Sequence, residues 1–251
     1  MNLDIKESFE KTRIAGTIAA AALNEVNKII KPGITTEKID RLCYEYINDH
    51  KAYSAPLFYR GFPKSSCTSV NHVVCHGIPS EKILKEGDIV NVDVTAFKDG
   101  WHGDTSRTFE VGKISIKAKK LIDTTYESMM RAIKILKEDV QLGDIGSTIQ
   151  EYVEAQGFSV VQDFCGHGIG QSFHKEPNVL HYGEKGTGKK ISEGMIFTIE
   201  PMINIGSYEI KTLNDGWTAV TKDKSLSAQF EHTIGVTKNS CEIFTELNNA
   251  N

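Results

Sequence analysis

The sequence predicts a single α+β domain, residues 1–251, in which two similar halves follow one another along the chain. Two helical patterns are followed by strand patterns, and the same order of elements then occurs a second time. A chain of 251 residues with 39% hydrophobic residues is long enough to bury a substantial core. Similar residues of the two halves also align when the sequence is shifted by 106 positions. These observations favour an internal two-fold repeat.

The first half begins with two predicted helices. Apolar residues at helical spacing run through residues 6–30, and the pair Pro32-Gly33 ends that pattern. A second helix is predicted at residues 35–50, because two threonine hydroxyls at its start suit an N-cap. Strands are expected to follow from about Ser65.

The second half has the same predicted order. Helices are expected at residues 116–137 and 143–155, and strands at residues 158–163 and 195–203. Matched apolar spacing alone would align several residues of the two halves, but a repeated helix-helix-strand unit is the better interpretation. The aligned pairs are Ile34 with Val140, Ile39 with Ile145, Glu45 with Glu151, Tyr46 with Tyr152 and Ile47 with Val153.

The segment Ile89–Val111 predicts a β-hairpin. Apolar and polar residues alternate with a period of two before Asp99-Gly100, a pair typical of tight hairpin turns. With a loop of two or four residues, Asp93 and Asp104 lie diagonally on one face of the hairpin. A loop of three residues would break that parity.

Two carboxylates on one sheet face repel each other unless a cation or a proton neutralises them. A polar, solvent-facing sheet surface is the alternative interpretation. Glu200 and Glu231 add two further acids, each expected within a strand-like segment, and Glu200 follows Asp93 by 107 positions, close to the repeat. Four carboxylates match two divalent ions, and an oxygen-rich site with one imidazole suits Mn²⁺, Fe²⁺, Co²⁺ or Zn²⁺.

Three histidines are candidates for the same site. His167 lies between glycines that permit a close approach of backbone and ring, and His174 follows seven residues later. His174 suits an acid, base or hydrogen-bond donor rather than a metal ligand, and His76 is a third cavity candidate. The remaining histidines are interpreted as structural: His50, His72, His102, His181 and His232.

Composition excludes several other classes of protein. A formal net charge of −4 provides no basic field for nucleic acid or anionic lipid, and no apolar run has the length of a membrane span. The five cysteines form no C-x-x-C pair, so neither a disulfide framework nor a zinc ribbon is indicated, and a reducing cytoplasm fits. The glycine-rich segments 166–170 and 183–190 each lack a residue that a nucleotide-binding loop requires.

Seven motifs occur in an order and spacing that resemble the bacterial-type type I methionine aminopeptidases. The motifs are Val74–Pro79, Asn91–Val94, Gly103–Thr108, Gly166–Gly170, Phe173-His174, Phe197–Pro201 and Gln229–His232. The resemblance covers nearly the whole chain. It implies the pita-bread fold, a pseudo-symmetric α+β domain that agrees with the internal repeat.

The resemblance also implies roles for individual residues. Two divalent metal ions (Co, Mn, Fe or Zn) would be held by Asp93, Asp104, His167, Glu200 and Glu231, with Asp104 and Glu231 bridging. A water activated by the two ions would attack the peptide carbonyl while Glu200 moves its proton, His174 stabilises the oxyanion and His76 lies near the scissile nitrogen. The methionine pocket would comprise Tyr59, Phe62, Cys67, Phe173 and Trp217, and His76 and His174 would also contact substrate. Pro56 and Arg60 depart from the common pattern, which has cysteine and histidine there.

The implied activity is removal of the initiator methionine from nascent polypeptides when the second residue is small and uncharged. The enzyme would be a cytoplasmic monomer that meets nascent N-termini near the ribosome and requires neither nucleic acid nor membrane. Two alternatives are a Xaa-Pro aminopeptidase on the same fold and a non-catalytic pita-bread binding module. A Xaa-Pro enzyme usually carries a large additional N-terminal domain, and a binding module usually loses ligand residues that are all present here.

Overall fold

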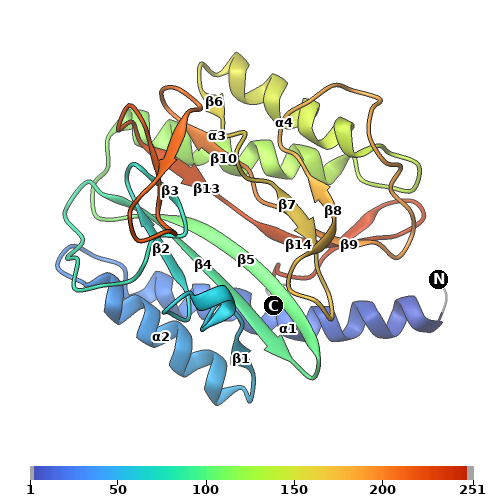
Figure 1. The fold of residues 1–251 in the computed structure, drawn as a ribbon, viewed down its shortest axis with the longest axis horizontal. Helices are drawn as coiled ribbons and strands as arrows, with labels where there is room; N and C mark the ends of the chain where they lie inside the picture. The colour runs from blue at the N-terminus through green and yellow to red at the C-terminus, as the bar shows by residue number, and fades with distance from the viewer. Residues whose placement is uncertain (1–2, 248–251) are drawn as a thin grey trace.

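The computed structural model describes residues 3–247, and its helices and strands follow the order that the sequence predicts (Figure 1). The helices are α1 (Leu3–Ile29), α2 (Thr36–Asp49), α3 (Ile116–Lys134) and α4 (Leu142–Ala155), and a 3-10 turn, η1, spans Tyr59–Gly61. All four predicted helices are therefore confirmed to within a few residues at each end. In this part of the chain no helix combines the length and apolar character needed to cross a bilayer.

The strands of the first half centre on one long hairpin. They are β1 (Tyr53–Ser54), β2 (Cys67–Val70), β3 (Val73–Cys75), β4 (Ile89–Lys98) and β5 (Trp101–Glu110). β4 pairs antiparallel with β1, β2 and β5. β1 lies before the expected start of the strands, because a strand of two residues leaves no periodic pattern in the sequence.

The strands of the second half are shorter. They are β6 (Ser159–Val160), β7 (Gly166–Gly168), β8 (Lys175–Val179), β9 (Ile196–Ile199), β10 (Met202–Asn204), β11 (Ile210–Thr212), β12 (Ala219–Thr221), β13 (Ser227–Gln229), β14 (His232–Val236) and β15 (Cys241–Ile243). Five of them form a sheet in the order β15-β14-β9-β7-β8, while β13-β10-β6 and β11-β12-β3 form two smaller sheets.

Three strand predictions need correction. The strand expected at residues 158–163 covers only two residues, and the one expected at 195–203 is interrupted at Glu200 and Pro201. Proline has no N–H for the ladder, which accounts for the interruption. Glu231 likewise lies between β13 and β14 rather than inside a strand. Both acids therefore sit where regular strand pairing stops.

The internal repeat is confirmed at the level of single hydrogen bonds. α2 and α4 each contain 14 residues and start 106 positions apart. Leu84 N donates to Ile34 O at 2.8 Å, and Ile191 N donates to Val140 O at 2.7 Å, so equivalent chain segments meet in the same way. In Figure 1 the pair α1 and α2 and the pair α3 and α4 lie on opposite sides, with strands between them.

Each helix pair packs over a hydrophobic core on one face of the strands, and polar residues lie on the opposite face of those strands. Val90, Val92 and Val94 of β4 are buried in the core beneath α1 and α2, so the intervening polar residues face away from it. The hairpin approaches α1 closely, since a Cβ atom added at Gly103 would collide with the backbone of Gly16. Glycine at this position lets the strand that carries Asp104 rest directly on the helix.

Candidate active site

The hairpin β4–β5 places the first two acids. Asp99 and Gly100 form a two-residue turn with φ of +48° and +87°, as a type I′ turn requires. The resulting register pairs Thr95 with Asp104 and leaves Asp93 diagonally adjacent on the same face. Thr95 Oγ1 donates a hydrogen bond to Asp104 Oδ1 at 2.7 Å. The predicted juxtaposition of Asp93 and Asp104 is confirmed.

Glu200 is held by hydrogen bonds at the break between β9 and β10. Its Oε1 accepts from Thr198 Oγ1 at 2.7 Å, its Oε2 accepts from Gln229 Nε2 at 3.3 Å, and its backbone N donates to His181 Nε2 at 3.1 Å. These partners fix both the carboxylate and the backbone that carries it. The position of Glu200 thus depends on residues from several segments.

Glu231 is held against the hairpin of the first half. Its N–H donates to Ser106 O at 3.1 Å, and its carbonyl accepts from Thr105 Oγ1 at 2.7 Å. Only 2% of Glu231 is exposed. The two halves of the molecule therefore meet directly at the acids.

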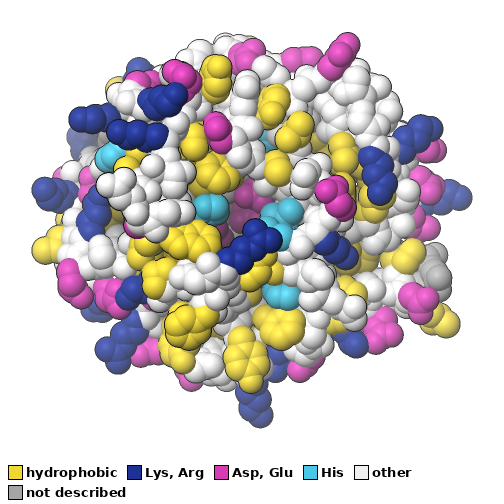
Figure 2. Space-filling view, viewed as in Figure 1, with side chains coloured by type: hydrophobic (Ala, Val, Ile, Leu, Met, Phe, Trp, Pro, Cys, Tyr) yellow, Lys and Arg dark blue, Asp and Glu magenta, His cyan; other side chains and the backbone are white. Residues whose placement is uncertain are grey.

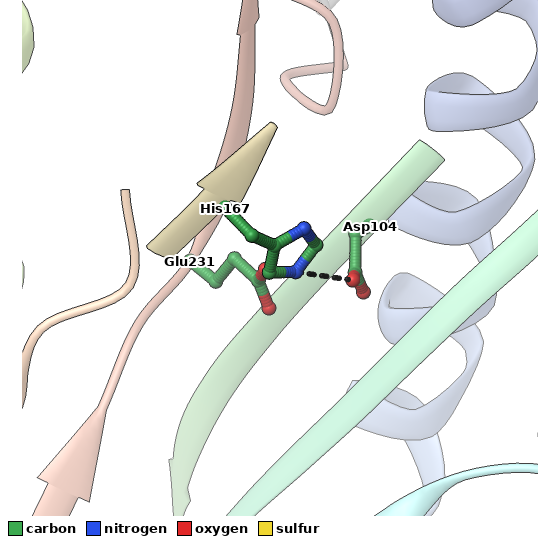
Figure 3. Close-up of side chains that lie close together, drawn as sticks. All are labelled: Asp104, His167 and Glu231. Atoms are coloured by element: carbon green, nitrogen blue, oxygen red, sulfur yellow. Dashed lines mark ion pairs between the residues drawn. The ribbon is translucent and has the colours of Figure 1, made fainter. Parts of the chain in front are cut away.

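His167, on β7, faces the same group of acids. Its Nε2 lies 3.7 Å from Asp104 Oδ2 and 3.6 Å from Glu200 Oε1. Ligand atoms of Asp104, His167 and Glu231 all lie within 4.8 Å of one another, and Figure 3 shows these side chains converging. Nδ1 of His167 lies 3.1 Å from Gly168 O and donates to it, which leaves Nε2 free for a metal ion.

Burial shifts the protonation equilibria of this group toward the neutral forms. Burial raises the pKa of Asp93 to about 7 and, together with the charge of Asp93, that of Glu200 to about 8. Burial and neighbouring acids raise the pKa of Asp104 and Glu231 well above the usual range. Burial lowers the pKa of His167 to about 4, so its ring is neutral at pH 7 and supplies no charge.

A divalent cation fits this donor set. Within residues 3–247 no lysine or arginine forms an ion pair with any of the four acids. Three buried carboxylates and the half-buried Asp93, beside one neutral imidazole, supply the oxygen and nitrogen ligands that Mn²⁺, Fe²⁺, Co²⁺ and Zn²⁺ accept. The site therefore has the chemistry of a metal centre.

An aromatic wall adjoins the acids. The rings of Phe62 and Trp217 pack edge to face with centroids 5.2 Å apart, and Trp217 also approaches His76 at 6.3 Å. On the other side Tyr59 contacts Phe173, with centroids 4.9 Å apart. These apolar surfaces suit an unbranched thioether side chain.

Two further histidines border the acids. His174 stacks on Tyr59, its Nδ1 lies 3.1 Å from the Tyr59 hydroxyl, and its ring centroid lies 4.1 Å from that of His167. Burial, the nearby His167 and the charge of Arg60 lower the pKa of His174 to about 3. His76 has a φ of +55° and a pKa lowered by burial. Both rings are therefore neutral at pH 7 and can donate or accept one hydrogen bond on each side.

All the residues proposed for the site line one cavity of about 510 Å³. Figure 2 shows it as a hollow with acidic side chains at its floor and histidines on its walls. The predicted lining residues are Tyr59, Phe62, Cys67, His76, Asp93, Asp104, His167, Phe173, His174, Glu200, Trp217 and Glu231, and Pro56 and Arg60 line it as well. A volume of this size suits one amino-acid side chain and part of a peptide.

Sequence reasoning missed two of the residues that hold the acids in place. Thr198 and Gln229 each donate a hydrogen bond to the carboxylate of Glu200. By contrast, hairpin parity does place Thr95 opposite Asp104, and His181, interpreted as structural, accepts from the backbone of Glu200. Strand parity contains a signal for Thr198, because it lies two positions before Glu200 and so shares its face. No local pattern signals the long-range partner Gln229.

Comparison with known protein families gives one match over most of the chain. Residues 10–238 match the model of metallopeptidase family M24. The methionine aminopeptidase of Rickettsia prowazekii is 54% identical over 246 residues, which cover 98% of this chain and 95% of that protein. The methionine aminopeptidase of Escherichia coli K12 is 54% identical over 249 residues, covering 98% and 94% of the two chains.

Solved structures show the same relationship. The crystal structure of the Rickettsia prowazekii methionine aminopeptidase superposes with a TM-score of 0.95 at 55% identity, covering 96% of this chain and 98% of that one. The prolidase from Pyrococcus furiosus superposes with a TM-score of 0.78 at 22% identity, covering 97% of this chain and 65% of that one. The second similarity shows a shared fold, and the first extends to more than half of the aligned sequence.

Proposed function

The chain belongs to metallopeptidase family M24 and, like the methionine aminopeptidases of that family, removes the N-terminal methionine of its substrates. On this basis we propose a role for each residue of the site. The observation that carries the proposal is the convergence of four acids, three of them buried, and His167 beside an aromatic pocket in one cavity. We propose that residues 1–251 form a single catalytic domain.

Asp93, Asp104, His167, Glu200 and Glu231 would hold two divalent ions, with Asp104 and Glu231 shared between them. This assignment is supported by the short distances around His167 and by the raised pKa values of the acids. Ions bound there would supply Lewis-acid chemistry, which lowers the pKa of water and polarises a carbonyl group. Mn²⁺, Fe²⁺, Co²⁺ and Zn²⁺ all suit these ligands, and availability decides among them in the cell.

Glu200 is the proposed proton carrier. Its Oε1 lies 3.6 Å from His167 Nε2, among the groups that would hold the ions, so it can accept a proton from the attacking water and release it again to the leaving amine. Thr198 and Gln229 hold its two oxygens, so the group stays oriented during the transfer. The proton would move from the attacking water to a Glu200 oxygen and then to the scissile nitrogen.

His174 is the proposed donor to the developing oxyanion. At pH 7 its ring is neutral, and if the Tyr59 hydroxyl donates to Nδ1, the remaining hydrogen lies on Nε2. Nε2–H can then donate to the carbonyl oxygen of the substrate as negative charge develops there. His76, on the opposite wall beside Trp217, would donate or accept a hydrogen bond near the scissile nitrogen.

The methionine side chain would occupy the pocket of Tyr59, Phe62, Cys67, Phe173 and Trp217. The free α-amine would be recognised at the metal centre that the acids form, which would make the enzyme an exopeptidase. We further propose that the second substrate residue must be small and uncharged, because it has to pass beside His76 and His174. The substrates would be nascent chains near the ribosome, met in the cytoplasm by a monomeric enzyme; five unpaired cysteines suit that reducing compartment.

A panel of short peptides tests this proposal. Met-Ala-Ser should release methionine, whereas N-acetyl-Met-Ala-Ser should not, because acetylation removes the free amine that the metal centre would recognise. Met-Lys-Ser and Met-Phe-Ser should turn over far more slowly than Met-Ala-Ser, since a large second residue prevents seating of the scissile bond. Release of methionine is measured by mass spectrometry.

Two results would contradict the proposal. Equal turnover of the acetylated and free peptides would show that the α-amine is not recognised. Preferential cleavage of Leu-Pro over Met-Ala would instead indicate a Xaa-Pro peptidase.

A further inference from the structure

Arg60 lies at the edge of the active-site cavity without an acidic partner. Its guanidinium carbon lies 5.3 Å from the centroid of the Tyr59 ring, and the residue is exposed. No carboxylate oxygen of residues 3–247 lies within 4 Å of its guanidinium nitrogens. Figure 2 shows a basic side chain lying across the edge of the hollow. A guanidinium group with unused donors can bind a carboxylate from outside the protein.

The backbone fixes the point from which the Arg60 side chain starts. Arg60 has a φ of +49°, in the left-handed region that non-glycine residues rarely adopt. The surrounding turn is held by Phe58 N donating to Phe62 O at 2.8 Å and by Phe62 N donating to Tyr59 O at 2.9 Å. Strained residues of this kind gather at ligand-binding sites, and here the strain places a cation over Tyr59.

A short series of contacts connects Arg60 to the catalytic end of the cavity. Arg60 lies over Tyr59, Tyr59 contacts His174, and the His174 ring lies 4.1 Å from that of His167. This inference rests on the proposed function, in which the first substrate residue occupies the closed pocket and later residues leave through the open edge. In an extended chain the third residue lies roughly 7 Å beyond the first. This length is comparable with the steps of 5.3 Å from Arg60 to the Tyr59 ring and 5.2 Å from that ring to His174, so we assign the third residue to the edge.

Apart from Arg60 and the four site acids, three charged residues line the cavity. Glu176 Oε2 already accepts a hydrogen bond from Asn178 N at 3.3 Å. Lys175 lies near a different wall, because a Cβ atom at Gly170 would lie 3.4 Å from its Nζ and 3.3 Å from the Trp101 ring. Asp163 is exposed and adds negative charge at the edge. Arg60 is thus the cation that lies over Tyr59, the hydrogen-bond partner of the proposed oxyanion donor.

We propose that Arg60 is a specificity residue that binds a carboxylate at the third position of the substrate. Peptides with Asp or Glu there should be preferred over neutral peptides of the same size. An exposed ion pair of this kind changes affinity by about two- to fivefold, and salt screens it. The preference should act on KM and leave kcat almost unchanged, because the guanidinium binds ground state and transition state alike.

The test compares Met-Ala-Glu-Ser and Met-Ala-Gln-Ser, both amidated at the C-terminus so that no terminal carboxylate competes. The metal-loaded wild-type enzyme should prefer the Glu peptide about two- to fivefold in kcat/KM at about 20 mM salt, and the ratio should approach one at about 0.5 M. Arg60→Gln, which removes the charge but keeps a polar, unbranched side chain and the same backbone demand, should bring the ratio to about one at low salt as well. Arg60→Lys should retain most of the preference.

Lys175→Gln is the matched control, since it removes a different cation from the same cavity and should leave the ratio unchanged. A wild-type ratio of one, or a preference that survives in Arg60→Gln, would overturn the inference. Loss of the preference in Lys175→Gln alone would also overturn it and assign the carboxylate to Lys175. Equal cleavage of the Glu and Gln peptides would overturn the inference but leave the proposed function intact. Failure of the wild type to cleave either peptide would overturn both the inference and the proposed function.

Discussion

The two halves of the molecule share one framework but position their acids in different ways. α2 and α4 start 106 residues apart, and equivalent hydrogen bonds join Ile34 to Leu84 and Val140 to Ile191. In the first half, Asp93 and Asp104 lie on a regular hairpin of two ten-residue strands. In the second half, Glu200 lies where regular pairing is interrupted.

The two halves therefore fix the positions of their acids by different means. Hairpin register alone brings the first two acids to one face, with Thr95 as an additional hydrogen-bond donor. Glu200 lacks a continuous ladder and depends on Thr198, Gln229 and His181. We therefore expect the first half to tolerate loss of a supporting hydrogen bond better than the second half.

The largest expected effect comes from removing one ligand of each half. Asp104→Asn and Glu231→Gln should each lower kcat/KM by much more than the roughly 10- to 100-fold loss that follows removal of an outer partner of a metal ligand. Each should also lose bound metal, because both carboxylates would be shared between the ions. Elemental analysis and turnover of Met-Ala-Ser measure the two effects. Full metal content in both variants would show that these acids are not shared ligands.

His174→Ala should have the next largest effect. Loss of a positioned oxyanion donor should lower kcat/KM by about two to four powers of ten while metal content stays near that of the wild type. This residue contacts Tyr59 and His167 but is assigned no metal. If elemental analysis found the metal site emptied in this variant, the assigned role would be incorrect.

Thr95→Val and Thr198→Val form a matched pair that tests the comparison between the halves. Each threonine hydroxyl donates to a site acid at 2.7 Å. Thr198 Oγ1 also accepts from His167 N at 3.0 Å, so its loss should lower kcat/KM about 10- to 100-fold. Thr95→Val should cost less than about tenfold, because the hairpin still fixes Asp104. Equal losses in steady-state kinetics would refute the distinction between the halves.

The smallest expected effects are on stability, and they come from substitutions at the N-termini of α2 and α4, which occupy equivalent positions in the two halves. Thr35 caps α2 by accepting from Lys38 N at 3.2 Å, and Thr35→Ala should lower the free energy of unfolding by about 1 kcal/mol. Asp144 accepts from Gln141 N at 2.9 Å and from Gly186 N at 2.8 Å, so Asp144→Ala should cost about 2 kcal/mol. Denaturant titration measures both values. A larger loss for Thr35→Ala would reverse the expected order.

The sequence predicts the first half of the site better than the second half. The alternation in β4 and the Asp99-Gly100 turn are local signals, and together they determine where Asp93 and Asp104 face. The helices and the 106-residue repeat are also readable, because apolar periodicity and N-caps are local.

The remainder depends on contacts between distant segments. Glu200 was expected within a continuous strand, but it lies at a break that Pro201 helps to create. Its partner Gln229 lies 29 residues away in sequence, and no period or turn signal connects them. The left-handed conformation of Arg60 is likewise set by the turn around it and leaves no trace in composition.

The most direct measurement of the central claim, that acids from both halves form one metal-dependent site, is turnover by protein stripped of metal. Protein treated with a chelator and verified by elemental analysis should not release methionine from Met-Ala-Ser, and activity should return as Mn²⁺, Co²⁺, Fe²⁺ or Zn²⁺ is added. The restored rate should rise with bound metal and level off at no more than two ions per chain. Full turnover by verified metal-free protein would contradict the claim.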